Sequence, residues 1–122
     1  MTNHATFLLT LQASVEFREF ENWYLDNENY DILAPYYTGI LPFKRLPESF
    51  QLTALVDYFR ERRKMIIKSL PIDCLDYWYW EILFEPIMGG LYEVKDEGVE
   101  APEYRTYSDA LRAAILKAIT LI

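Results

Sequence analysis

The first apolar pattern along the chain predicts a helix over residues 6–26. Its apolar residues recur three or four positions apart, as on one face of a helix: Leu9, Ala13, Phe17, Phe20 and Tyr24. The charged residues Glu16, Arg18 and Glu19 are expected on the other faces. The short apolar stretch from Phe7 to Leu11 leaves a buried strand open as an alternative for that part of the segment.

Two later segments repeat the helical spacing. One runs from Ser49 to about Lys64, with Pro47 just before it and Ser49 as the expected N-cap. The other closes the chain, with Ser108 as its expected N-cap and Asp109 in its first turn. Their apolar faces are predicted from the spacing: Leu52, Leu55, Val56 and Phe59 in the first, and Leu111, Ile115, Ala118 and Ile122 in the second.

Between these two helices the pattern changes to strands. Met65 to Leu70 is short and β-branched, and Pro71 is expected to end it. Tyr77 to Glu85 alternates, which places an apolar set on the core side: Trp78, Trp80, Ile82 and Phe84. The opposite set, expected to be partly solvated, follows: Tyr77, Tyr79, Glu81, Leu83 and Glu85. After a turn at Gly89-Gly90, the next expected strands are Leu91 to Val94 and Tyr104 to Tyr107.

In residues 27–47, Asn, Gly and Pro interrupt both the helical and the strand spacing of apolar residues, yet the segment is rich in aromatic residues. A long irregular segment of this kind either packs on the domain or carries function. Both alternatives stay open from the sequence. Because Tyr gives a large contact area at low entropic cost, we regard six aromatic residues as candidates for binding a partner: Tyr30, Tyr36, Tyr37, Phe43, Tyr77 and Tyr79.

The order of elements predicts an α+β fold in one domain. Residues 48–122 would form a two-layer sandwich with a helix–β–β–β–helix core, the topology of double-stranded RNA-binding domains. Residues 1–47 would add an N-terminal helix and an aromatic-rich loop. The chain has 122 residues, of which 52% are hydrophobic, so it can bury enough apolar surface to fold.

Composition also bounds the cellular setting. The single Cys74 excludes a disulfide scaffold and suits a reducing compartment, where we expect it to be a small buried residue. Neither a basic signal region nor a lipidation motif is present, and no apolar run is long enough to span a bilayer. The expected location is therefore the cytoplasm.

The net charge of -7 is unevenly distributed. Acidic residues concentrate in residues 16–31 and 85–103, whereas a basic patch lies between Arg60 and Lys68: Arg60, Arg62, Arg63, Lys64 and Lys68. Cations at the end of a helix complement its dipole, which explains the patch structurally; an anion site is the alternative. The last helix offers only Arg112 near its start, in place of the lysine cluster of double-stranded RNA-binding domains.

Known chemistry finds little support in the sequence. His4 and Cys74 are too few for a zinc site. The segment from Asp26 to Asp31 resembles the opening of an EF-hand loop, but Tyr30 and Tyr37 replace ligands, which argues against calcium. The chain has no nucleophile elbow and no phosphate loop. Carboxylate pairs remain as candidates for acid–base chemistry: Asp73 with Asp76, and Glu81 with Glu85.

From Gln51 onward the chain resembles small uncharacterised proteins of Bacteroides-type bacteria, their phages and mobile elements. The motifs concerned are Asp57-Tyr58-Phe59-Arg60-Glu61, the strand Tyr77 to Phe84, and Tyr104 to Leu111. The last of these is also similar to the C-terminal part of HicB-type antitoxin domains, without their Gly-rich strand. The resemblance implies no activity, cofactor or site residue.

These observations favour a non-enzymatic module for protein–protein interaction or regulation, with an unidentified protein partner or a second copy of the chain. The alternatives are a protein linked to nucleic acid, either a weak binder through the basic patch or an acidic mimic that occupies a DNA-binding protein, and a carboxylate-based hydrolase. An acidic chain is repelled by phosphate backbones, which argues against the binder. We expect no membrane, metal or cofactor.

Overall fold

The computed structural model describes residues 3–26, 42–72, 77–84, 92–95 and 104–122. Helices and strands both contribute, which confirms the α+β class. In chain order the elements are α1 (His4–Gln12), α2 (Val15–Asp26), the 3-10 helix η1 (Phe43–Arg45), α3 (Glu48–Arg63), β1 (Met65–Ile72), β2 (Tyr77–Phe84), β3 (Tyr92–Lys95) and α4 (Tyr107–Thr120).

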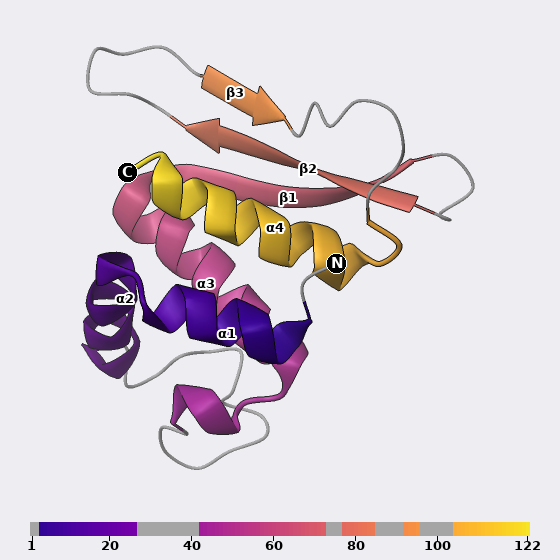
Figure 1. Ribbon diagram of the computed structural model, residues 1–122. Helices are drawn as coiled ribbons and strands as arrows, with labels where there is room; N and C mark the ends of the chain where they lie inside the picture. The colour runs from indigo at the N-terminus through magenta and orange to yellow at the C-terminus, as the bar shows by residue number, and fades with distance from the viewer. Residues whose placement is uncertain (1–2, 27–41, 73–76, 85–91, 96–103) are drawn as a thin grey trace.

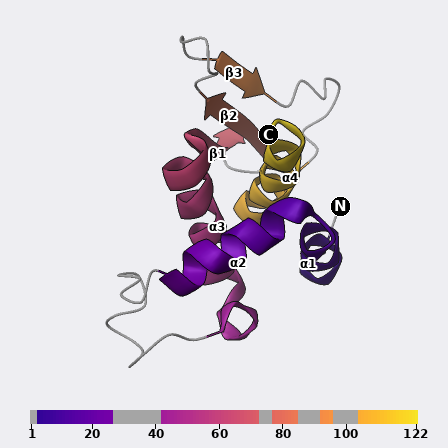
Figure 2. The same ribbon diagram turned by 90° about the vertical axis from the view of Figure 1, so that its left-hand side faces the viewer.

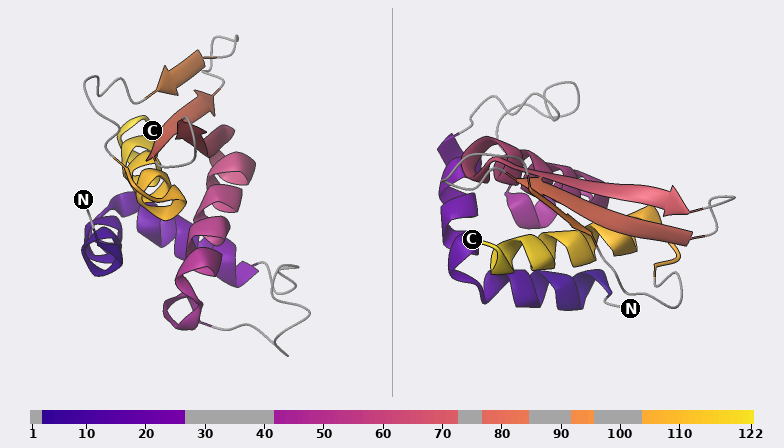
Figure 3. Two further views of the ribbon diagram at one scale, coloured as in Figure 1. Left: turned by 90° about the vertical axis from the view of Figure 1, so that its right-hand side faces the viewer. Right: turned by 90° about the horizontal axis from the view of Figure 1, so that it is seen from above.

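The helices form two tiers on the sheet, one more than the expected two-layer sandwich of residues 48–122 contains. α4 packs on β1 and β2, and α3 contacts both β1 and α4. α1 and α2 lie beyond them, farther from the strands (Figure 1). α2 crosses α3 (Figure 2), and α1 runs beside α4 (Figure 3).

The N-terminal helices belong to the same core as the rest, because one hydrophobic cluster of the described residues includes Phe7 of α1, Phe20 of α2, Phe59 of α3 and Ile115 of α4. A helix–β–β–β–helix core of the double-stranded RNA-binding type, complete in itself with an appended N-terminal segment, is therefore not what the chain forms. The sheet is also uneven, since β1 and β2 pair over eight residues each whereas β3 pairs over four.

The expected single N-terminal helix is broken at Ala13 and Ser14. The Ser14 amide donates to the Leu11 carbonyl at 3.0 Å and its hydroxyl donates to the same oxygen at 2.6 Å, so the backbone turns there. The break shifts the buried face: Leu11 is buried, whereas Leu9 is 69% exposed. The spacing of apolar residues does not reveal this break, because it is caused by a Ser side chain that competes for backbone hydrogen bonds.

Strand β1 continues through Pro71 to Ile72, so the expectation that Pro71 ends it is wrong. Pro71 lies opposite Trp78, and the Trp78 amide donates away from β1 to the Tyr104 carbonyl at 2.8 Å. The pair is therefore a non-hydrogen-bonded one, and the missing Pro71 amide would have pointed outward from the edge strand. The segment at Tyr104 forms this single bridge, and the expected strand there is replaced by the start of α4.

The predicted core side of the main strand is confirmed at its centre. Trp80 and Ile82 are buried, while Trp78 and Phe84 are half-buried at the two ends. From β1, Met65, Ile67 and Ser69 are buried on the same side, and the Ser69 hydroxyl donates to the Tyr107 carbonyl of α4 at 2.9 Å. Strand β3, Tyr92–Lys95, falls within the predicted returning strand except that it extends one residue further.

Both expected N-caps are displaced. α3 begins at Glu48 with Pro47 as its N-cap, so Ser49 lies inside the helix. α4 begins at Tyr107, and the Thr106 hydroxyl, not that of Ser108, accepts from the Asp109 amide at 3.0 Å. The buried face of α4 is confirmed at Leu111, Ile115 and Ala118, whereas Ile122 follows the helix and is 53% exposed.

The position of the cap gives a direct test. We expect Thr106→Ala to lower the free energy of unfolding by about 1 kcal/mol, because it removes the acceptor for a helix-terminal amide. Ser108→Ala is the matched control, with an expected change of less than about 0.5 kcal/mol. Urea unfolding followed by circular dichroism measures both. A larger loss for Ser108→Ala would contradict the assignment of the cap.

None of the helices in the described part of the chain combines the length and apolar character needed to cross a membrane.

Candidate functional site

A buried ion pair joins α2 to α3. Glu16, in the first turn of α2, is buried at 8% exposure. Arg63, at the end of α3, donates to both carboxylate oxygens of Glu16, with Nε 2.6 Å from Oε1 and Nη2 2.9 Å from Oε2. The hydroxyl of buried Tyr58 also donates to Oε1. The expectation that Glu16 faces away from the core is therefore wrong, because the carboxylate is matched by three donors from α3.

The protonation of this cluster suits a structural role. Burial, followed by the hydrogen bond to Glu16, raises the pKa of the Tyr58 hydroxyl well above its ordinary value. The hydrogen bond to Glu16 raises the pKa of Arg63. Both groups therefore keep their protons at neutral pH, and neither is poised to exchange one with a substrate. We interpret the cluster as a clasp between the two helices.

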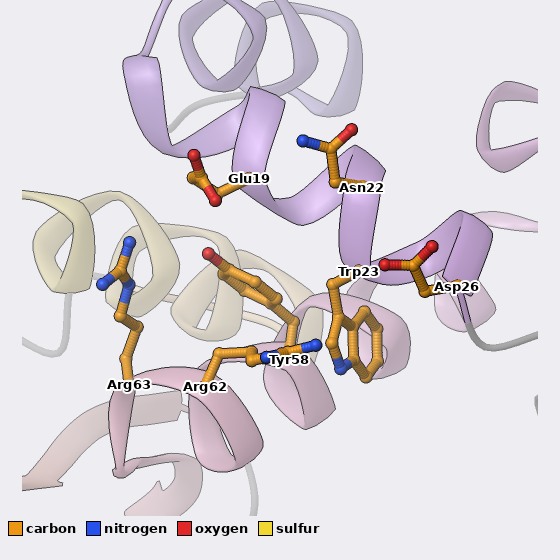
Figure 4. Close-up of a pocket in the computed structure, with 7 residues that line it drawn as sticks. All are labelled: Glu19, Asn22, Trp23, Asp26, Tyr58, Arg62 and Arg63. Carbon is orange, nitrogen blue, oxygen red and sulfur yellow. The ribbon is translucent and has the colours of Figure 1, made fainter.

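A pocket of about 310 Å³ opens beside this clasp, between α2 and α3 (Figure 4). Its residues are Glu19, Asn22, Trp23, Asp26, Tyr58, Arg62 and Arg63. Carboxylates come from α2 and guanidinium groups from α3, so the pocket carries both signs of charge. The described residues that line it include no Ser, Thr, Cys or His, and thus no ordinary nucleophile.

A second polar network joins α1, α3 and α4. Buried Arg112 donates from Nε to His4 Nδ1 at 3.0 Å, from Nη1 to Asp109 Oδ1 at 3.0 Å and from Nη2 to Glu48 Oε2 at 3.3 Å. Because His4 Nδ1 accepts, its Nε2 carries the proton and donates to Gln51 Oε1 at 2.5 Å. The side-chain Nε2 of Gln51 donates to the backbone carbonyl of Phe43 at 2.9 Å. The guanidinium group of Arg112 thus makes its hydrogen bonds inside the fold and is not presented to phosphate.

The predicted basic patch is divided among different surroundings. Arg60 pairs with Asp57 at 2.9 Å, and Arg63 is the partner of Glu16. Arg62 lines the pocket that also holds two carboxylates. Lys64 ends α3 in the left-handed conformation with a φ of 56°, and exposed Lys68 lies on β1. The five residues therefore do not present one uniformly positive surface.

Tyr77 and Tyr79 lie together on the face of the sheet that points away from α4. We call this the outer sheet face, and within β1 and β2 it consists of Ile66, Lys68, Leu70, Ile72, Tyr77, Tyr79, Glu81 and Leu83. The strand register places these residues opposite one another in pairs: Ile66 with Leu83, Lys68 with Glu81, Leu70 with Tyr79, and Ile72 with Tyr77. Ile66 is 44% exposed, Lys68 is exposed and the other six are half-buried.

Of the remaining aromatic candidates, Phe43 is excluded as a contact residue. It is buried in η1, and its ring packs edge-on to that of Phe20 at 4.9 Å. At its C-terminal end the aromatic-rich segment therefore packs on the core. Tyr30, Tyr36 and Tyr37 lie outside the described residues, as do Cys74, the residues of the expected turn at Gly89-Gly90, and Asp73, Asp76 and Glu85. The described residues contain no group of three or more potential metal ligands.

No protein-family model matches the chain, and the comparisons with curated proteins and with solved structures find no match either.

The sequence indicates the outer sheet face more clearly than it indicates the clasp between α2 and α3. The alternation of β2 marked Tyr77 and Tyr79, and Ile66, Leu70 and Ile72 add apolar residues at alternate positions of β1. The presence of apolar residues on both faces of a strand is the feature of the sequence that could have predicted the outer sheet face. The clasp had no such signal, because Glu16 is separated from Arg63 by 47 positions and falls in an acidic stretch.

Proposed function

We propose that this protein is a non-enzymatic interaction module that binds another protein molecule through its outer sheet face. The observation that supports it is the pairing of apolar residues across β1 and β2 on the side away from α4. An apolar surface of this kind gains free energy when a partner removes it from water. The interior polar groups described above serve the fold, and among the described residues this face is the best candidate for function.

The proposal predicts that one charge on this face weakens association. We expect Ile66→Asp to reduce binding at least about tenfold, because an ionised carboxylate would have to be desolvated at the contact. Ile66 is exposed, so the fold itself tolerates the change. Tyr79→Ala is a second variant, which removes an aromatic contact without adding charge. Light scattering at several concentrations and affinity capture measure the association.

Leu9→Asp is the matched control, since it introduces the same charge at an exposed apolar residue of α1. It should leave association unchanged. A wild-type chain that stays monomeric and captures no protein contradicts the proposal. So does an Ile66→Asp variant that associates as strongly as the control.

A further inference from the structure

His4 is the only histidine of the chain and the first residue of α1. Its side chain is 11% exposed and lies between Arg112 of α4 and Gln51 of α3. Histidine is the side chain that ordinarily changes its charge between about pH 5 and about pH 8. Since no other residue of α1 is titratable, a proton on His4 changes the charge of the whole helix.

The neighbours of the His4 ring fix which of its nitrogens carries a proton. Arg112 Nε can only donate, and it lies 3.0 Å from His4 Nδ1, which must therefore accept. Gln51 Nε2 donates to the Phe43 carbonyl, so Gln51 Oε1 is the atom that faces His4 Nε2, at 2.5 Å. Because that oxygen can only accept, His4 Nε2 must donate. The two contacts together hold His4 as the neutral imidazole with its proton on Nε2.

Three effects oppose a second proton on this ring, which would have to be placed on Nδ1. The proton would replace the acceptor of Arg112 Nε with a donor, and it would bring two cations into contact while the Arg112 side chain is only 9% exposed. Burial of His4 disfavours its charged form. In addition, His4 is at the N-terminal end of α1, where the helix dipole disfavours a cation.

The carboxylates near the ring oppose these effects only weakly. Glu48 Oε2 of α3 lies 4.0 Å from His4 Nδ1, but the Glu48 side chain is 64% exposed and its charge is screened by solvent. Asp109 of α4 already accepts from Arg112 at 3.0 Å. The charged residues of η1, exposed Lys44 and Arg45, disfavour a further cation. α2 also packs on α1, but in the described part of the chain none of its charged side chains has a hydrogen bond or an ion pair with His4. The balance favours the neutral ring.

We infer that His4 is a pH-sensitive switch, whose protonation breaks the contact with Arg112 and favours an open form in which α1 leaves α4. The open form binds the proton more readily than the docked form, so docking is lost as the pH falls. Opening exposes Phe7 and Leu11, which are 0% and 1% exposed in the docked form. α1 lies beyond α4 and away from the strands (Figure 1), so the inference does not rest on the proposed function of the outer sheet face.

Native-state hydrogen exchange of the α1 amides measures the docking. We expect the protection factors of the amides from Phe7 to Leu11 to fall about tenfold between about pH 7.5 and about pH 5.5. A proton bound by the open form alone changes the equilibrium by at most about tenfold per pH unit, and the contact with Glu48 offsets part of that change. Protection factors are compared instead of rates, because the rate of exchange from the open form itself depends on pH.

His4→Asn is the matched control, because its amide oxygen supplies an acceptor for Arg112 Nε and stays neutral at every pH in this range. Its protection factors should not change with pH, and every other titratable group is common to the two proteins. Arg112→Met removes the donor that opposes the second proton, so the fall should disappear. Glu48→Gln removes the nearest carboxylate, so the fall should become larger than in the wild type.

The ring itself gives a measurement that needs no variant. The nitrogen NMR spectrum of the wild-type chain with labelled histidine should show the proton on Nε2 at about pH 7.5. A proton on Nδ1 would overturn the inference, even if the substitutions prevent folding. So would protection factors that fall equally in the wild type and in His4→Asn, a wild-type α1 that becomes better protected in acid, or an Arg112→Met variant that keeps the wild-type fall.

Discussion

Replacing Arg63 with Met is expected to lower the free energy of unfolding by about 2 to 3 kcal/mol. The substitution leaves the Glu16 carboxylate buried with only the Tyr58 hydroxyl as a partner. The expected loss is below that of a fully buried pair because the Arg63 side chain is 34% exposed. Urea unfolding followed by tryptophan fluorescence measures it.

Arg62→Met is the matched control, because Arg62 is the preceding residue of α3 and is exposed. It should change the free energy of unfolding by less than about 0.5 kcal/mol. The double variant Glu16→Leu/Arg63→Met removes both charges and should recover most of the lost stability. Equal effects of Arg62→Met and Arg63→Met would show that the clasp does not hold the helices together.

Truncating Phe20 to Ala should have the largest effect in the chain, a loss of about 3 to 5 kcal/mol. Phe20 is 1% exposed, and its ring lies 4.9 Å from that of Phe43 and 5.5 Å from that of Tyr58. Its removal opens a cavity where α2, η1 and α3 meet. Thermal unfolding followed by circular dichroism should show a lower midpoint temperature.

Leu25→Ala tests whether that loss is specific to the buried face of α2. Leu25 belongs to the same helix but is 60% exposed, so its truncation should change stability by less than about 0.5 kcal/mol. If Phe20→Ala costs no more than this control, the N-terminal helices do not belong to the cooperative core. Residues 42–122 would then be expected to unfold independently of α1 and α2.

The local sequence pattern is sufficient to predict the buried face of an element whose apolar residues recur at regular spacing without interruption. The α3 face at Leu52 and Leu55 and the β2 face at Trp80 and Ile82 are buried as the spacing predicts. The pattern is insufficient where a side-chain hydrogen bond determines at which residue a helix begins or ends. Ser14 turns the backbone between two helices, and Thr106 caps α4 in place of Ser108. Those choices depend on backbone geometry that spacing does not encode.

The candidate sites follow the same division. Tyr77 and Tyr79 lie on the predicted second face of their strand, because a strand alternates locally. The tertiary partners of Arg63 and Arg112 depend on which helices pack together, and the sequence alone therefore predicts one basic surface where the structure has several separate contacts. The burial of Phe43 likewise depends on α2, so the local sequence does not reveal it.

Pro71 limits how copies of this chain can assemble. β1 lies at the edge of the sheet, and an added strand would need amide donors at alternate positions along it. Position 71 offers none in the outward direction, so a growing ladder is interrupted there. The proline thus disfavours growth of the sheet by addition of strands from other copies at this edge.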